Sequence, residues 1–482
     1  MDNIIETFDR LKLSTTEEQI EDICFEIRSY LSRDASFVLK SELIPYIGLG
    51  LDIKTHSEVN YTTLLQFNVL VQEKATDVLK YLLSTEYIYK LVDLLASPNL
   101  KIAVMVMGIL KKLLLIPVEG EKFMLSTQFS NYFTEFYQKH SKESTEVQFR
   151  CFDIAAIILS KDNKSLIQKY NPFLMMISDT FEKTSDELIQ MNVIEIISTI
   201  CLQTQGLLLV KNIGIFENFN KRLLETIKIA EDTQVDINTL PLPLLNKIIN
   251  FVGSVSSISN ENTQILFQND FMKVFEYHLE NHHQNTLSKY FLNSIITALG
   301  NMGVNNKGLD MILQQPQIMK DYMELILSND HQISTSVMIS FSIMLHNKDP
   351  LNIVSEKLYQ IYQTIPSELL SQRLLKNLTS PQEEVKKANF SLLTSLCIHS
   401  WGVEDVIKIP GFYEYLIGHF NETNKIYREW KFKIIQNIVD NHQELFKTSP
   451  EKISQFHQLT NYLRRGPHYI ETESRVDYAT VP

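Results

Sequence analysis

The sequence predicts an all-α protein built as a solenoid of helical repeats, and three observations support this prediction. The chain holds only 14 glycines and 14 prolines among 482 residues, roughly half of their ordinary combined usage, so turns that need their special backbone angles are few. Apolar residues make up 44% of the chain, which is enough to bury a sizeable core. They follow the helical period almost to the C-terminus, and no run of alternating strand residues interrupts them.

A turn followed by a long, strongly apolar helix recurs along the chain. The mean spacing between these helices is about 47 residues, which agrees with the roughly 40–47 residues of armadillo and HEAT repeats. One interval is longer because the acidic stretch from Glu231 to Pro243 is inserted, and we expect this stretch to form a surface loop. The long helices are expected to begin near Lys101, Glu146, Glu187, Leu244, Thr286, Ile333, Glu384 and Tyr427.

Within each repeat, a short polar-to-apolar segment and a middle helix precede the long helix. Middle helices are predicted at 87–95, 271–279 and 412–420. The order of short, middle and long helix is that of an armadillo repeat. The clearest single match is Ala298-Leu-Gly-Asn-Met302, which is close to the armadillo consensus at the end of the third helix.

Repeat units bury their apolar faces against neighbours, so the terminal units of such a chain must be capped. We expect an N-terminal helical cap over 1–56, an armadillo/HEAT-like repeat array over 57–440, and a C-terminal cap helix with a polar tail over 441–482. Ser14 and Glu17 have the spacing of a capping box, which predicts the start of a helix. Gly466-Pro467 ends the helical pattern near the C-terminus.

The charge balance excludes several function classes. The chain has 45 Lys+Arg against 57 Asp+Glu, a formal net charge of −12, and no basic stripe that would bind nucleic acid or anionic lipid. We find no bilayer-spanning stretch and no signal-peptide pattern. Cys24, Cys151, Cys201 and Cys397 are widely spaced among apolar residues, which indicates buried thiols in a reducing compartment. We expect a cytoplasmic protein, with the nucleus as a second compartment, and neither membrane nor nucleic acid as a partner.

Motifs for catalysis and cofactor binding are missing from the sequence. Gly48-Leu-Gly50 begins a dinucleotide-binding fingerprint, but Ile53 occupies the position of its third glycine. There is no P-loop, no HExxH and no GxSxG motif. We therefore predict no enzyme activity, no catalytic residue and no cofactor.

The histidines offer one candidate metal site. His278 and His282 are four residues apart, with His283 adjacent, and two histidines at this spacing can share a metal if further ligands exist. The alternative is that they are solvated histidines in a turn between helices, and we favour it because Asn281 and Asn285 flank them. No metal site is predicted. His399 and Trp401, which follow a long helix, are expected to pack rather than catalyse.

The remaining candidate is a surface for binding other proteins. In an armadillo-type superhelix, polar residues spaced by four along the third helices line the concave side and can contact partners. The alternative is that this is only the solvated side of each helix. The candidate partner-binding residues are Asn293, Thr297 and Asn301 in one repeat, Asn250 and Ser254 in the one before, and Glu195 and Thr199 in the one before that.

Near the C-terminus the chain resembles the 26S proteasome non-ATPase regulatory subunit 5 family. The resemblance lies in Pro410-Gly-Phe-Tyr-Glu-Tyr-Leu416, in Asn461-Tyr-Leu-Arg-Arg-Gly-Pro-His-Tyr-Ile470, and in His399-Ser-Trp401 upstream. It implies an armadillo/HEAT solenoid that acts as a non-enzymatic assembly chaperone. The implied partners are the ATPase subunits of the proteasome regulatory-particle base, bound reversibly and largely through their C-terminal domains. The resemblance carries no motif of binding residues onto this chain, and we expect a monomer when no partner is bound.

The main alternative is a different armadillo-type adaptor or scaffold. Importin-like binders place Trp and Asn pairs regularly along the groove, whereas this chain has only Trp401 and Trp430, both towards one end. An acidic solenoid would suit a partner with basic patches, because complementary charge speeds encounter.

Overall fold

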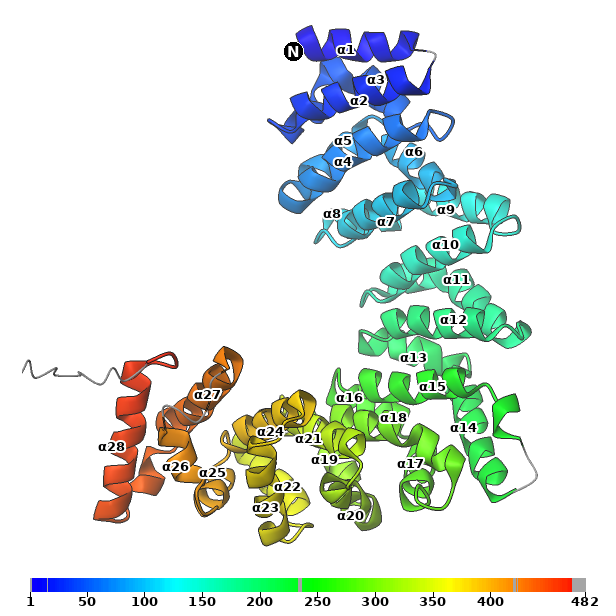
Figure 1. Cartoon of the computed structure of the whole chain (residues 1–482). Helices are drawn as coiled ribbons and strands as arrows, with labels where there is room; N and C mark the ends of the chain where they lie inside the picture. Colours follow the sequence, from blue (N-terminus) through cyan, green and yellow to red (C-terminus); the bar gives the residue numbers. More distant parts are fainter. Residues whose placement is uncertain (1, 15, 233–235, 419–421, 423, 470–482) are drawn as a thin grey trace, which may run out of the picture. The chain divides into compact units, whose positions relative to one another are not determined.

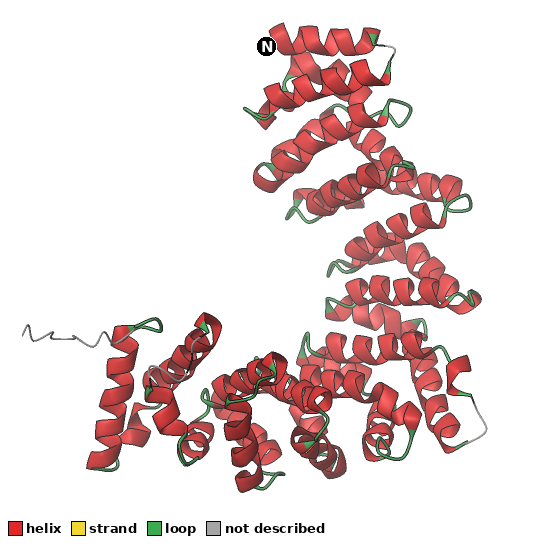
Figure 2. Ribbon diagram, viewed as in Figure 1, coloured by secondary structure: helices red, strands yellow, loops and turns green. Residues whose placement is uncertain are grey.

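The computed structural model describes residues 2–14, 16–232, 236–418, 422 and 424–469. These residues form helices joined by turns, with no strand among them (Figures 1 and 2). The predicted all-α solenoid class is therefore confirmed. By internal contacts the chain divides into two compact units, Met1–Ile213 and Gly214–Pro482, which are described one at a time.

Unit 1 begins with two antiparallel helices and continues as stacked repeats. Its long helices α4, α7, α10 and α12 contact one another in chain order. The helices are α1 (Asp2–Leu13), α2 (Glu17–Leu31), α3 (Ile44–Gly50), α4 (Ser57–Glu73), α5 (Ala75–Ser84), α6 (Tyr87–Asp93), α7 (Leu100–Leu114), α8 (Glu119–Leu125), α9 (Thr127–His140), α10 (Thr145–Leu159), α11 (Lys164–Lys183), α12 (Glu187–Ile200) and α13 (Thr204–Asn212), with short 3₁₀ turns at Ala35–Leu39, Ser41–Leu43 and Leu94–Ala96.

Unit 2 repeats the order of short, middle and long helix more regularly. Its long helices α15, α18, α21, α24 and α27 form one continuous stack. The helices are α14 (Ile215–Glu231), α15 (Leu242–Ser256), α16 (Asn260–Leu266), α17 (Phe271–Glu280), α18 (Thr286–Met302), α19 (Asn306–Leu313), α20 (Pro316–Glu324), α21 (His331–Leu345), α22 (Leu351–Tyr362), α23 (Ser367–Leu378), α24 (Glu383–Leu396), α25 (Ser400–Ile407), α26 (Phe412–Ile417), α27 (Lys425–Asn441) and α28 (Pro450–Arg465), with 3₁₀ turns at Ile237–Thr239, Leu325–Leu327 and Gln443–Phe446.

The predicted long helices are confirmed. Each expected start lies within two residues of the observed start of α7, α10, α12, α15, α18, α21, α24 or α27. The armadillo-like segment Ala298–Met302 forms the end of α18, and α28 stops directly before Gly466. The predicted insertion at 231–243 includes residues 233–235, and the predicted polar tail includes 470–482, which lie outside the described residues.

The predicted capping box at Ser14 is wrong. Helix α1 already runs to Leu13, and the Ser14 hydroxyl donates to the carbonyl of Arg10 in that helix, at 2.9 Å. The N-cap of α2 is Thr16, whose Oγ1 accepts from the backbone N–H of Gln19. The chain reverses between two helices here, so the hydroxyl nearer to α2 takes the capping role.

Small residues allow the long helices of unit 2 to approach closely. A Cβ atom added at Gly253 of α15 would lie 2.5 Å from the Cα of Ala298 in α18. A Cβ at Gly300 of α18 would clash with the backbone and side chain of Ser340 in α21. Glycine is therefore required at these two crossings, because any side chain would force the backbones apart.

Side chains in the turns after the long helices cap the preceding repeat. The last carbonyls of a helix have no partner within the helix. In unit 2 the ends of α15, α18, α21 and α24 are each bonded by a side chain that comes about one repeat later, which ties these consecutive repeats together. The bonds run from Asn305 Nδ2 to Ser256 O (2.8 Å), Asn347 Nδ2 to Gly303 O (2.7 Å), His399 Nε2 to Leu345 O (3.2 Å) and His442 Nε2 to Cys397 O (3.1 Å).

The four cysteines are buried and carry free thiols, as predicted. Burial raises the pKa of Cys151 to about 12 and also raises the pKa of Cys201 and of Cys397. Such thiols are unreactive at neutral pH. Within the part of the chain that the structure describes, no helix is long and apolar enough to cross a bilayer.

Candidate protein-binding surface

The predicted polar stripe lies on the solvent side of the long helices. Thr297 in α18 is exposed, and Asn250 and Ser254 are exposed on the neighbouring α15. Asn293 and Asn301 of α18 are half-buried. Glu195 and Thr199 lie on the outer side of α12 in the other unit, with Glu195 exposed and Thr199 half-buried.

The hydroxyl groups of this stripe are already hydrogen-bonded within their own helices. Thr297 Oγ1 donates to Asn293 O at 2.9 Å, and Ser254 Oγ donates to Phe251 O at 3.1 Å. Thr199 Oγ1 donates to Glu195 O at 3.3 Å. The hydroxyl groups of these residues are therefore not free donors for a partner.

One repeat further along, the same helix side opens into a groove of about 950 Å³. Its lining residues come from α21, α24 and α27 and from the turn before α24. These three helices contact one another in that order (Figure 1). Ile339 of α21 is 45% exposed there, although isoleucine is usually buried. The lining residues are His331, Gln332, Thr335, Ser336 and Ile339 from α21, Gln382, Glu383, Glu384, Val385, Lys387, Ala388 and Ser391 in and next to α24, and Trp430 from α27.

The groove is lined by both apolar and charged side chains. Glu383 and Glu384 occupy the first turn of α24, where the positive end of the helix dipole favours acidic residues. Lys387 Nζ lies 3.0 Å from Glu383 Oε2, and this hydrogen bond raises the pKa of Lys387. Aliphatic and aromatic anchors next to a polar rim are typical of protein-binding surfaces. The groove is thus suited to docking another protein.

Ile339 and Trp430 are not among the binding residues predicted from the sequence, although the sequence contains a signal for Ile339. Thr335, Ile339 and Ile343 continue the four-residue spacing of the α18 stripe one repeat later. An isoleucine in a strongly apolar helix is normally assigned to the core, however. Only the packing of α21 against its neighbours shows that Ile339 and Ile343 face solvent.

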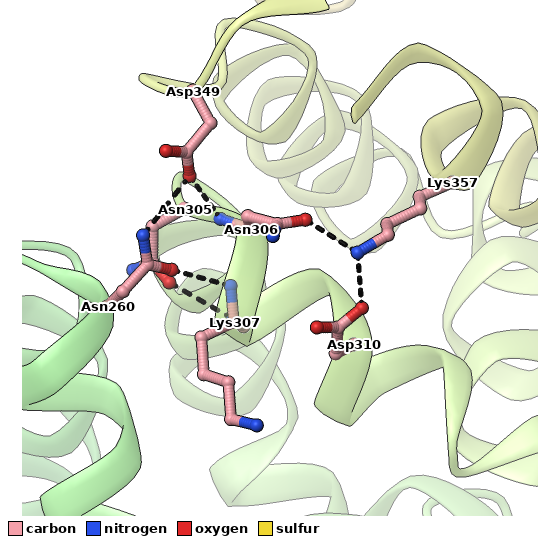
Figure 3. A network of polar contacts seen from close by, with 8 residues as sticks. Asn260, Asn305, Asn306, Lys307, Asp310, Asp349 and Lys357 are labelled. Atoms are coloured by element: carbon pink, nitrogen blue, oxygen red, sulfur yellow. Dashed lines mark hydrogen bonds and ion pairs between the residues drawn. The ribbon is translucent and has the colours of Figure 1, made fainter. Parts of the chain in front are cut away.

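A second polar cluster, drawn in Figure 3, links three inter-helix turns and is structural. Asn260 Oδ1 accepts from the backbone N–H of Lys307, and Asp349 Oδ2 accepts from that of Asn306, both at 2.6 Å. Lys357 Nζ donates to Asn306 Oδ1 at 2.6 Å and forms an ion pair with Asp310. Because the Lys357 amine is held by these two partners, it is not available as a free nucleophile.

Asn305, next to this cluster in Figure 3, is expected to be important for stability. It is buried, caps α19 by accepting from Gly308 N at 3.0 Å, and donates to Ser256 O and to Thr263 Oγ1. Asn305→Ala should lower the free energy of unfolding by about 2 kcal/mol, since it removes an N-cap and two buried hydrogen bonds. Urea unfolding followed by circular dichroism measures the change. Asn424, the exposed N-cap of α27, is the control, and an equal loss from Asn424→Ala would contradict the role of burial.

The expectation of solvated turn histidines is wrong for two of the three. His278 lies within α17, which continues to Glu280, and is fully buried against neighbouring helices. His282 is only 9% exposed, whereas His283 is exposed. Burial lowers the pKa of His278 to about 4 and also lowers the pKa of His282. Among the described residues, no group of three or more His, Cys, Asp or Glu is placed to hold a metal ion.

The predicted packing role of His399 and Trp401 is confirmed. His399 is buried and its ring stacks on Trp401 at 5.1 Å between centroids. Trp401 also packs against Tyr359 and Tyr362, at 5.1 and 5.0 Å. His399 and Trp401 therefore belong to the packing interface between two neighbouring repeats.

Stacked helical repeats with an open groove define the class of this protein as a helical-repeat scaffold. The family model described as "Proteasome non-ATPase 26S subunit" matches residues 2–231 and 355–481, more than half of the chain. The chain belongs to the proteasome non-ATPase 26S subunit family. No curated protein matches it.

Among solved structures, the chain is similar to engineered proteins, one of which is a designed armadillo repeat protein. The crystal structure of one engineered protein has a TM-score of 0.39 and 15% sequence identity, covering 91% of this chain and 99% of the other. A designed armadillo repeat protein, solved in complex with the peptide (KR)4, has a TM-score of 0.38 and 12% identity, covering 54% of this chain and 98% of the other.

Proposed function

We propose that this protein is a non-catalytic chaperone in assembly of the 26S proteasome regulatory-particle base, as a member of the subunit 5 branch of its family. The observation that carries the proposal is membership of a proteasome subunit family in a chain whose long helices form a docking groove. The resemblance of residues 410–416 and of the segment that follows Asn461 to the subunit 5 family supports the finer assignment.

The proposed partner is the C-terminal domain of a base ATPase subunit, docked on the groove over α21, α24 and α27. Ile339 supplies an exposed aliphatic anchor and Trp430 an aromatic one. Hydrophobic anchors inside a polar rim provide specific binding, and a modest number of them keeps that binding reversible. Reversibility is what an assembly factor requires, because it must leave before the particle is complete.

No catalytic step is assigned to the chain, and no cofactor is needed for this role. We place the protein in the cytoplasm and also in the nucleus, as a monomer when no ATPase subunit is bound. An importin-like adaptor is less well supported, because Trp401 packs against Tyr359 and Tyr362 and is not among the residues that line the groove.

Ile339→Lys should weaken binding of the ATPase domain by about tenfold or more. A lysine at this position must be desolvated when the partner docks, and the substitution removes an exposed aliphatic anchor. The measurement is the dissociation constant for purified base ATPase C-terminal domains, by calorimetry, with circular dichroism to verify the fold.

The matched control is Ile353→Lys in α22, where the isoleucine is 46% exposed but does not line the groove. This variant should bind as tightly as the parent. Equal weakening by both variants would argue against the groove as the docking site. Failure of the parent chain to bind any base ATPase, or recovery from cells mainly with intact 26S particles, would contradict the chaperone proposal itself.

A further inference from the structure

Unit 2 also has a pocket near the turns that precede α18 and α21. It has a volume of about 520 Å³ and lies between the end of α17 and α20, two helices that pack against each other (Figure 1). None of its lining residues belongs to the groove described above. The lining residues are Leu279, Glu280, His282, His283, Asp321, Glu324, Leu325, Leu327, Ser328, Asn329 and Asp330.

Two buried acceptors in this pocket have no hydrogen-bond partner in the protein. His282 is 9% exposed, and its Nδ1 lies 2.6 Å from the carbonyl oxygen of Leu279. A carbonyl only accepts, so Nδ1 carries the proton and Nε2 presents a lone pair, which is unpaired. Asp321 Oδ1 accepts from Gln317 Nε2 at 2.7 Å, whereas its buried Oδ2 is also unpaired.

The other charged groups that line the pocket are also acceptors. Glu280, Glu324 and Asp330 contribute carboxylates, and neither lysine nor arginine lines the pocket. Asp330 Oδ1 is already used to cap α21. Lys320, the nearest ion-pair partner of Glu324, is largely exposed and 3.9 Å from it. Buried acceptors without donors are costly, so this arrangement favours a ligand that only donates.

We propose that this pocket binds the guanidinium group of an arginine side chain from a protein partner. A guanidinium has five N–H donors in a planar fork and no acceptor, so it suits a pocket whose lining residues carry unpaired acceptors. The volume is ample for one side chain. A divalent cation is the less suitable occupant, because no three metal-ligating groups come together in the described residues. The proposal does not depend on the identity of the partner.

The test uses the full chain with Nα-acetyl-arginine N-methylamide as the probe and the neutral citrulline analogue as its matched control. Histidine-selective ¹⁵N labelling follows the ring of His282, which is assigned by its disappearance in His282→Gln. The arginine probe should shift the Nε2 resonance of His282, and the citrulline analogue should not. Asp321→Asn should weaken probe binding by about tenfold or more, because a charge-assisted hydrogen bond is lost.

Asp270→Asn is the control for the loss of a carboxylate, since Asp270 pairs with Lys273 outside the pocket. It should leave probe binding unchanged. If circular dichroism shows that Asp321→Asn has lost helicity, His282→Gln is used as the pocket variant instead. Its affinity for the arginine probe is then compared with that of Asp270→Asn. Equal binding of the two analogues, no shift at His282 under saturating arginine probe, or a response to Zn²⁺ alone would overturn the proposal.

Discussion

Gly253→Ala is expected to destabilise the protein by about 2 kcal/mol or more, although alanine is normally the better helix former. The new Cβ would lie 2.5 Å from the Cα of Ala298 and 2.8 Å from its Cβ. Backbone atoms cannot rotate away as a flexible side chain can, so α15 and α18 must separate. Separation also opens space between two closely packed helices, which adds a packing loss.

The matched control is the same substitution in α7. Gly108 also lies within a long helix, but a Cβ atom there would meet nothing within 4 Å. Gly108→Ala should therefore stabilise the protein by about 0.5–1 kcal/mol through helix propensity alone. The urea midpoints of the two variants should move in opposite directions. Stabilisation by Gly253→Ala would show that the two helices can move apart without cost.

Acidification from pH 6.5 to pH 4 is expected to remove up to about 3 kcal/mol of stability through His278. Its pKa falls from an ordinary value near 6.5 to about 4 because the ring is buried. The unfolded chain therefore binds this proton first as the pH falls. The stabilising contribution is complete above about pH 6.5 and is lost as the pH falls through the folded-state pKa.

The hydrogen bonds of His278 explain why it stays neutral. Thr226 Oγ1 donates to Leu223 O at 2.6 Å, so it accepts from His278 Nε2–H at 2.8 Å. Nδ1, which then carries the lone pair, lies 2.9 Å from the hydroxyl of Ser288. A proton on Nδ1 would place a charge in a site without a carboxylate partner among these contacts.

His278→Gln should be less stable than the parent at pH 7.5 but should lose less stability between pH 6.5 and pH 4. Urea unfolding at intervals across this range gives the slope. The slope should not disappear, because burial also lowers the pKa of His282, His399 and His442. His457→Gln, at an exposed position of α28, should leave the slope as it is. An unchanged slope in His278→Gln would contradict the assignment.

Gly253 lies in the stack of long helices that also forms the groove. The close approach of α15, α18 and α21 at Gly253 and Gly300 fixes where each following long helix lies. His399 and His442 then tie the last repeats to the ends of α21 and α24. A loss of stability in this stack should therefore weaken partner binding as well, even where the groove residues are untouched.

The histidines show the limit of local reasoning. Flanking asparagines favour a turn at 281–285, and a turn is present after α17. The burial of His278 and His282, however, depends on α14, α18 and α20, which belong to other segments of the chain. Sequence spacing places both histidines on one helix face but does not say what covers that face.

For the binding surface, too, the sequence predicts one part and only the structure shows the rest. The four-residue spacing of Asn293, Thr297 and Asn301 identifies the solvent side of α18, and the structure keeps these residues on that side. The groove itself needs three helices from three repeats, and its anchor Ile339 has a residue type that sequence patterns assign to the core.

The sequence by itself determined that this protein is all-α, where its long helices begin and where the last helix ends. These features depend on apolar period, glycine and proline positions and caps, all of which act over a few residues. The tertiary structure alone decided which apolar side chains face solvent, which histidines are buried and which acceptors lack a donor. Those properties depend on the distance between repeats, and that distance is set by side-chain volume at crossings such as Gly253 with Ala298.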